Sequence, residues 1–165
     1  MARILIVGGG CRGRELAREL VDSAHAVRVT TRTGANRAAI EQAGAECFIG
    51  TPDRLATLRG ALDRVAVVCW LLAGAGGGEE VVAELHSARL RAFVHQIIDT
   101  TARGLVYERG ASSGDSFAVL ESGERIVRQL AEQNAIPLAV LGEDIRDREA
   151  WLRGARAAVS GLLGE

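Results

Sequence analysis

The sequence contains no lysine, because all 20 of its basic residues are arginines. This absence excludes chemistry that needs a lysine side chain, such as Schiff-base catalysis, Walker A phosphate loops and tyrosine–lysine catalytic couples. Aromatic residues are also scarce, at 4% of the chain. So few rings disfavour a β-sandwich core and any surface that would stack nucleic-acid bases.

A strong charge of either sign is missing as well, since 20 basic residues balance 21 acidic ones to leave a net charge of −1. We therefore expect no nucleic-acid or anionic-membrane partner. The three cysteines contain no Cys-x-x-Cys pair, which indicates reduced thiols in a cytoplasmic protein and no metal site. No signal peptide is visible, and the apolar runs are far shorter than the roughly 20 residues of a membrane span.

The residues that are present favour a packed α/β domain. Apolar residues make up 48% of the chain, which is enough for a substantial core. Short apolar runs alternate with segments of helical periodicity from end to end. We expect helices near residues 13–24, 37–43, 55–62, 79–90, 117–133 and 146–163. The expected strands cover residues 4–7, 27–31, 46–49, 65–72, 93–98 and 137–141.

Strands that alternate with crossover helices form a parallel, doubly wound sheet, so the sequence predicts a six-stranded Rossmann sheet in the order 3-2-1-4-5-6. No linker or repeat divides the chain, so we expect a single domain over residues 1–165 without a separate substrate domain. Residues 100–115 are rich in glycine and serine, and a loop of that length is typical of a mobile functional segment.

A glycine-rich motif follows the first expected strand and opens the first expected helix. Gly8, Gly10 and Gly13 form the pattern G-x-G-x-x-G, with Cys11 and Arg12 inside it. The first glycine suits a tight turn, the second a close approach of the backbone to a pyrophosphate, and the third close packing of helix on strand. The helix N-terminus offers free N–H groups to the anion. The motif therefore predicts dinucleotide binding.

Two other interpretations of this motif remain beside dinucleotide binding. A glycine-rich turn can exist without any ligand. A methyltransferase can carry a similar loop, but it needs an acidic residue just before the glycines, where this chain has Ile6 and Val7. The methyltransferase interpretation is therefore disfavoured.

The end of the second expected strand indicates which dinucleotide binds. A site for NAD places an acidic residue about 20 residues after the glycines, on the ribose hydroxyls. This chain has Thr31 and Arg32 there, and its next acid is Glu41. A guanidinium at Arg32 suits a 2′-phosphate, and Arg12 and Arg14 at the head of the first helix could add to that clamp. The pattern favours NADP over NAD, although a solvated arginine is the simpler alternative.

Three further segments are expected at the carboxyl edge of the sheet, where ligands of this fold bind. Leu72, Ala73 and Gly74 begin a second glycine-rich loop that could pass beneath the cofactor, with a flexible connection as the alternative. The pair Asp99-Thr100 would end the fifth strand and could bind ribose or a substrate carbonyl, with a helix cap or turn as the alternative. Tyr107, the single tyrosine, would lie in the 100–115 loop as the candidate catalytic acid, with a surface tyrosine as the simpler alternative.

The chain resembles the atypical short-chain dehydrogenase/reductase group, which includes NmrA-like and biliverdin-reductase-like Rossmann proteins. The resemblance covers nearly the whole chain. Its pieces are residues 4–13, 27–32, 44–46, 91–94, 124–130 and 136–138.

This resemblance implies an NADP-binding protein and leaves two functions open. Ordinary members of the group carry Tyr-x-x-x-Lys, and the corresponding positions here fall near Ser116 and Leu120, so the couple is missing. Some members reduce substrates without it, and others only sense the redox state of NADP. We expect either an NADPH-dependent reductase of a small carbonyl or conjugated substrate, or a redox sensor that acts on a protein partner. The sequence indicates no particular substrate, and a homodimer is compatible with both functions.

Overall fold

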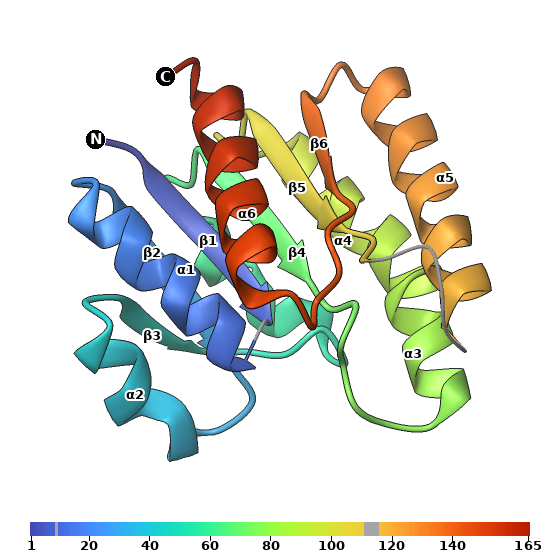
Figure 1. The fold of residues 1–165 in the computed structure, drawn as a ribbon. Helices are drawn as coiled ribbons and strands as arrows, with labels where there is room; N and C mark the ends of the chain where they lie inside the picture. Colours follow the sequence, from blue (N-terminus) through green and yellow to red (C-terminus); the bar gives the residue numbers. More distant parts are fainter. Residues whose placement is uncertain (9, 111–115) are drawn as a thin grey trace.

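A parallel sheet organises the chain in the order β3-β2-β1-β4-β5-β6, with helices on both faces (Figure 1). The computed structural model describes residues 1–8, 10–110 and 116–165. The predicted Rossmann topology is confirmed. The strands are β1 (Arg3–Gly8), β2 (Ala26–Thr31), β3 (Glu46–Ile49), β4 (Val67–Leu71), β5 (Gly104–Glu108) and β6 (Leu138–Leu141).

The helices cover both faces of the sheet. One hydrophobic cluster packs α1, α2 and α6 on one face, and another packs α3, α4 and α5 on the opposite face. In the described parts of the chain, short 3-10 turns lie at Gly34–Asn36, Leu55–Leu58 and Gly60–Leu62. The helices are α1 (Gly10–Asp22), α2 (Arg37–Gln42), α3 (Glu79–Leu85), α4 (Ala88–Ile98), α5 (Phe117–Gln133) and α6 (Arg148–Leu163).

The central strands β1 and β4 are buried on both faces, as parallel strands covered by helices must be. Their register pairs Val7 with Trp70 and Gly8 with Leu71, so the two strands end level with each other. All the strands end at the lower edge in Figure 1, beside the start of α1. This carboxyl edge is where a ligand site is expected in the fold.

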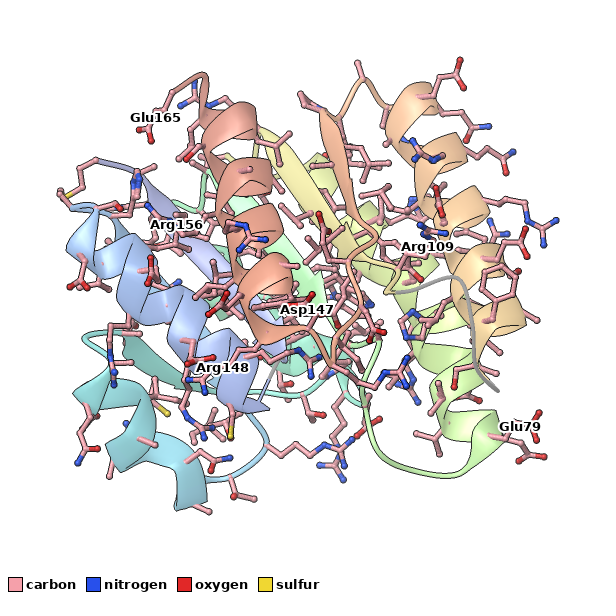
Figure 2. The ribbon with its side chains drawn as sticks, in the orientation of Figure 1. Glu79, Arg109, Asp147, Arg148, Arg156 and Glu165 are labelled. Atoms are coloured by element: carbon pink, nitrogen blue, oxygen red, sulfur yellow. The ribbon has the colours of Figure 1, made fainter. Side chains whose placement is uncertain are left out.

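The last helix closes the sheet against the first. Asp147 caps α6 by accepting a hydrogen bond from the Ala150 N–H at 3.1 Å. Arg148 and Arg156, labelled in Figure 2, form ion pairs with Glu15 and Glu19 on α1. These pairs are exposed and contribute little stability. The buried Trp151, Ala155 and Val159 supply the apolar contact that holds α6 in place.

The predicted fifth strand at 93–98 is wrong, because these residues belong to α4. Their buried members are Phe93, Val94 and Ile97, a helical spacing that places one face against the sheet. The true β5 lies inside the segment predicted as a loop, and every one of its residues is buried. Residues 111–115 of that predicted loop lie outside the described residues.

This correction also moves Asp99 and Thr100 away from the expected site. They follow the C-terminus of α4 and precede β5. The adjacent Thr101 hydroxyl donates to the Val65 carbonyl at 3.0 Å, just before the start of β4. Asp99 and Thr100 therefore lie at the amino edge of the sheet, opposite the glycine motif. They cannot contact a ligand bound at the carboxyl edge.

No helix in the described parts of the chain is both long enough and apolar enough to cross a membrane.

Candidate functional site

The turn between β1 and α1 depends on glycine at two positions. Gly8 has a φ of +83°, and a Cβ there would lie 2.9 Å from the Leu71 carbonyl oxygen. At Gly13 a Cβ would lie 2.7 Å from the carbonyl oxygen of Gly8, so α1 packs directly over the end of β1. By contrast, a Cβ on Gly10 would meet nothing within 4 Å. A side chain at Gly10 would therefore extend into open space at the start of α1, where the first N–H groups of a helix have no intrahelical partner.

Two adjoining cavities occupy that open space. The first, of about 180 Å³, lies between the glycine turn and the ends of β2 and β3. The second, of about 740 Å³, lies between the turn and the loop that follows β4. Gly8, Gly10, Arg32, Leu72 and Ala75 line both, so the two are parts of one groove along the carboxyl edge. A groove of this shape suits a long ligand that crosses the start of α1.

The first cavity combines apolar and hydroxyl groups with two arginines. Thr31 and Arg32 line it, as does Arg14 from the second turn of α1. The Arg32 side chain is 62% exposed and pairs with Asp53 at 2.9 Å. Val29, Thr30, Asn36 and Ile40, from β2 and the segment that follows it, also line this cavity. Gly50, Pro52 and Leu85 complete the lining, and sequence reasoning did not identify them because they come from segments remote in the chain.

Arg12 does not extend towards Arg32 as the predicted clamp requires. Its guanidinium instead lies 3.4 Å from the carboxylate of Glu108 and 5.3 Å from the centre of the Trp151 ring. Arg12 still lines the second cavity, with Cys11 and Gly74. Arg14, rather than Arg12, shares the first cavity with Arg32. Of the two arginines predicted to add to the clamp, Arg14 therefore lies beside Arg32 in the first cavity, whereas Arg12 is engaged by Glu108.

Glu108 is a fully buried carboxylate that joins four elements at the end of β5. It accepts hydrogen bonds from the Trp151 indole at 2.7 Å and from the Ala73 N–H at 2.9 Å, in addition to Arg12. A buried charge needs such partners, because burial without them is costly. Glu108 thus fixes the loop after β4 to α1 and α6. An acid that ends a short apolar run was the one available signal for it in the sequence.

Tyr107 is fully buried in β5 and does not lie in a surface loop as predicted. Its hydroxyl is 2.8 Å from Nδ1 of the buried His86, beneath α5. A Cβ on Gly123 of α5 would overlap that hydroxyl, so glycine at this position leaves room for it. Tyr107 is not among the residues that line either cavity. In this conformation it cannot donate a proton to a substrate in the groove.

The hydrogen bonds around His86 define its neutral tautomer. Nε2 is 3.1 Å from the Leu72 carbonyl, which can only accept, so Nε2 carries the proton. Nδ1 then accepts from the Tyr107 hydroxyl. Burial lowers the pKa of His86, against a smaller opposing effect of the Leu72 carbonyl. Burial also raises the pKa of Tyr107, with help from the charges of Glu124 and Glu108. Both groups are therefore neutral at physiological pH.

The site contains thiol and carboxylate groups, but they do not form a metal centre. Within the ranges that the structure describes, no three His, Cys, Asp or Glu side chains gather closely enough to hold a metal ion. Cys11 is exposed and lies 3.2 Å from the Arg14 guanidinium, at the edge of the groove.

Comparisons with known proteins detect a likeness in structure and none in sequence. No family model matches the chain, and no curated protein matches it. Among solved structures, vestitone reductase from alfalfa (Medicago sativa) is similar, at 14% identity and a TM-score of 0.64 over 86% of this chain. A short-chain dehydrogenase/reductase superfamily protein from Agrobacterium tumefaciens is similar at 16% identity and a TM-score of 0.69 over 85% of this chain.

A UDP-glucuronic acid 4-epimerase from Bacillus cereus is also similar, at 18% identity and a TM-score of 0.66 over 85% of this chain. This chain spans about half the length of the three solved structures, covering 56%, 48% and 56% of them respectively. The likeness extends over most of the present chain. The chain thus has the Rossmann fold of these reductases and epimerases.

Proposed function

We propose that the groove binds NADP(H), with the adenosine half in the cavity between the glycine turn and the ends of β2 and β3. The observation that carries the proposal is the guanidinium of Arg32 at the end of β2, beside an opening lined by Thr31 and Arg14. Arginine donates in a fork geometry that matches phosphate, and the hydroxyl residue leaves room for it. A nucleotide with a 2′-phosphate gives these cations a counter-charge that NAD lacks.

The residues at the centre of the groove fit the pyrophosphate of such a ligand. The start of α1 has no acidic residue in its first turn, and the space before Gly10 is open. Free N–H groups and the positive end of the helix dipole favour an anion there. Two of the similar structures, those of the Agrobacterium protein and the Bacillus epimerase, hold NAD. These relatives support a nicotinamide dinucleotide as the class of ligand.

On this basis the chain acts as an NADPH-dependent reductase of a small carbonyl or conjugated substrate. The bound cofactor would supply a hydride. The contribution of the chain is to orient the ring over the loop that begins with Leu72, Ala73 and Gly74, and to exclude water from it. The larger cavity, lined by Arg12 and Gly74, leaves space for a substrate next to that loop. Water then provides the proton, since Tyr107 is sealed away.

A second function, a redox sensor that binds NADP(H) without turnover, is favoured by one observation. The hydroxyl of the single tyrosine is directed into the core, towards His86. A sensor needs no proton donor at the nicotinamide ring, whereas a reductase gains rate from one. The loop after β4, fixed by Glu108, would then transmit the state of the cofactor to a protein partner.

Replacing Gly10 by tryptophan tests whether the groove binds a dinucleotide. The indole would fill the space before α1 and reduce NADPH affinity by roughly a hundredfold or more, about 3 kcal/mol. The positive φ of Gly10 adds about 1–2 kcal/mol of strain, which the fold should tolerate. Gly34→Trp is the matched control, because a Cβ there also meets nothing within 4 Å and Gly34 lines neither cavity. Fluorescence titration should give one site per chain, lost in Gly10→Trp alone. Retained binding would reject the assignment.

Turnover separates the two functions once binding is established. NADPH oxidation is followed at saturating cofactor against quinones, flavins and aldehydes. Oxidation that depends on a substrate and disappears in Gly10→Trp supports the reductase. Tight binding with no oxidation by any acceptor class supports the sensor.

A further inference from the structure

An acidic side chain pairs with the arginine that lines the first cavity, although the end of β2 contains no acid. Asp53, from the segment after β3, brings its Oδ2 to 2.9 Å from Nη2 of Arg32. The carboxylate is therefore next to the group that would meet a 2′-phosphate. Asp53 and Arg32 are about 20 residues apart in the sequence. They meet because β2 and β3 pair in parallel and end together.

The position of Asp53 is fixed more firmly than that of an ordinary surface acid. The Thr51 hydroxyl is 3.2 Å from its Oδ2 and also accepts from its backbone N–H at 3.3 Å. Arg89 of α4 donates to the carbonyl oxygens of Pro52 and Asp53. The side chain is 37% exposed. The carboxylate is thus held beside Arg32 from both its side chain and its backbone.

We propose that Asp53 is a specificity-determining residue that opposes Arg32 and limits the preference for NADP(H) over NAD(H). This inference rests on the proposed dinucleotide function. A 2′-phosphate carries close to two negative charges. Asp53 repels it and at the same time occupies a guanidinium donor that the phosphate could use. The ribose hydroxyl of NAD carries no charge, so Asp53 does not disfavour it.

The size of the effect follows from the geometry. An arginine that binds a carboxylate on one side and a phosphate on the other holds the two anions about 6 Å apart. In an exposed site, the repulsion between them is reduced by the solvent dielectric and by salt, so a roughly fivefold loss in affinity for the phosphorylated ligand is expected. The loss should shrink as ionic strength rises.

The test is Asp53→Asn, which removes the charge and keeps an oxygen to accept from Thr51. The matched control is Asp63→Asn, because Asp63 is also paired with an arginine, Arg64, and precedes β4 at the opposite edge of the sheet. The probes are adenosine 2′,5′-bisphosphate and 5′-AMP, which differ by the 2′-phosphate alone. Their Kd values are measured by calorimetry at low and high salt.

Asp53→Asn should bind the bisphosphate about fivefold more tightly, leave 5′-AMP within twofold, and lose most of this gain in high salt. Asp63→Asn should change neither Kd. If both probes bind the wild type and Asp53→Asn leaves their ratio unchanged or lowers it, the inference is overturned and the proposed function stands. If neither probe binds the wild type, the adenosine site itself is wrong and both proposals fall.

Discussion

The two halves of the carboxyl edge differ in how their polar groups are used. On the side of β2 and β3, the arginine of the site is 62% exposed and its partner Asp53 is 37% exposed, around an open cavity. On the side of β5, Glu108, Tyr107 and His86 are at most 1% exposed. Tyr107 and His86 are hydrogen-bonded to each other, and Glu108 accepts hydrogen bonds from groups of α1, α6 and the loop after β4. Polar groups that are already satisfied inside the core support a site, whereas exposed and partly satisfied ones remain available to a ligand. Under the proposed function, the first half therefore binds the adenosine part of the ligand, and the second half supports the loop after β4.

The largest effect is expected from removing the anchor of the buried half. Glu108→Ala leaves Arg12 without its carboxylate and the Trp151 and Ala73 N–H groups without an acceptor. Breaking a buried pair of this kind costs about 3–5 kcal/mol. Urea unfolding should show that loss, against less than about 1 kcal/mol for Glu19→Ala, whose ion pair is exposed. Equal losses in the two variants would contradict the anchoring role.

A smaller effect is expected from the buried tyrosine. Tyr107→Phe removes the hydroxyl that donates to His86 and should lower the free energy of unfolding by about 1–2 kcal/mol. Because the hydroxyl does not reach the groove, the NADPH Kd and any rate of NADPH oxidation should stay within about twofold. If Tyr107→Phe kept wild-type stability but no longer oxidised NADPH, Tyr107 would be the catalytic acid. The buried half would then take part in the reaction and would not be a support alone.

The smallest expected effect is the pH dependence of stability that His86 of the buried half causes. Burial lowers the pKa of His86 in the folded protein, so below its ordinary pKa of 6.5 the unfolded chain binds a proton that the folded chain does not. Stability should therefore fall as pH decreases below about 6.5, until the lowered pKa is reached. The decline in Tm between pH 7.5 and 5 should be shallower in His86→Gln. A parallel decline in both proteins would show that His86 is not the group responsible.

The sequence predicted the open half better than the buried half, for a physical reason. Gly8, Gly10 and Gly13 lie in one short motif whose turn, space and helix packing are all local properties. Arg32 comes directly after β2, which is the next strand along the chain. These positions could be placed in the structure because chain order and spatial order coincide there.

The buried half depends on contacts between distant segments, which leave little trace in the sequence. In the sequence of β5, only the three apolar residues 105–107 lie between Gly104 and Glu108, so this segment resembles part of a loop. The apolar residues in the second half of α4 instead resemble those of a strand. That exchange misplaced Tyr107 and moved Asp99 to the wrong edge of the sheet. Glu108 is held by partners 35 to 96 residues away, a separation that no spacing rule detects.

The most direct test of the account compares NADPH and NADH on the wild type and on Arg32→Ala. A charge-assisted contact to the 2′-phosphate contributes about 1.5–3 kcal/mol, or roughly tenfold to a hundredfold in affinity. The four Kd values should show that the wild type prefers NADPH at least roughly tenfold, and that Arg32→Ala removes most of this preference with little change for NADH. A wild type that prefers NADH, or a variant that weakens both cofactors equally, would contradict the assignment of Arg32 to the 2′-phosphate.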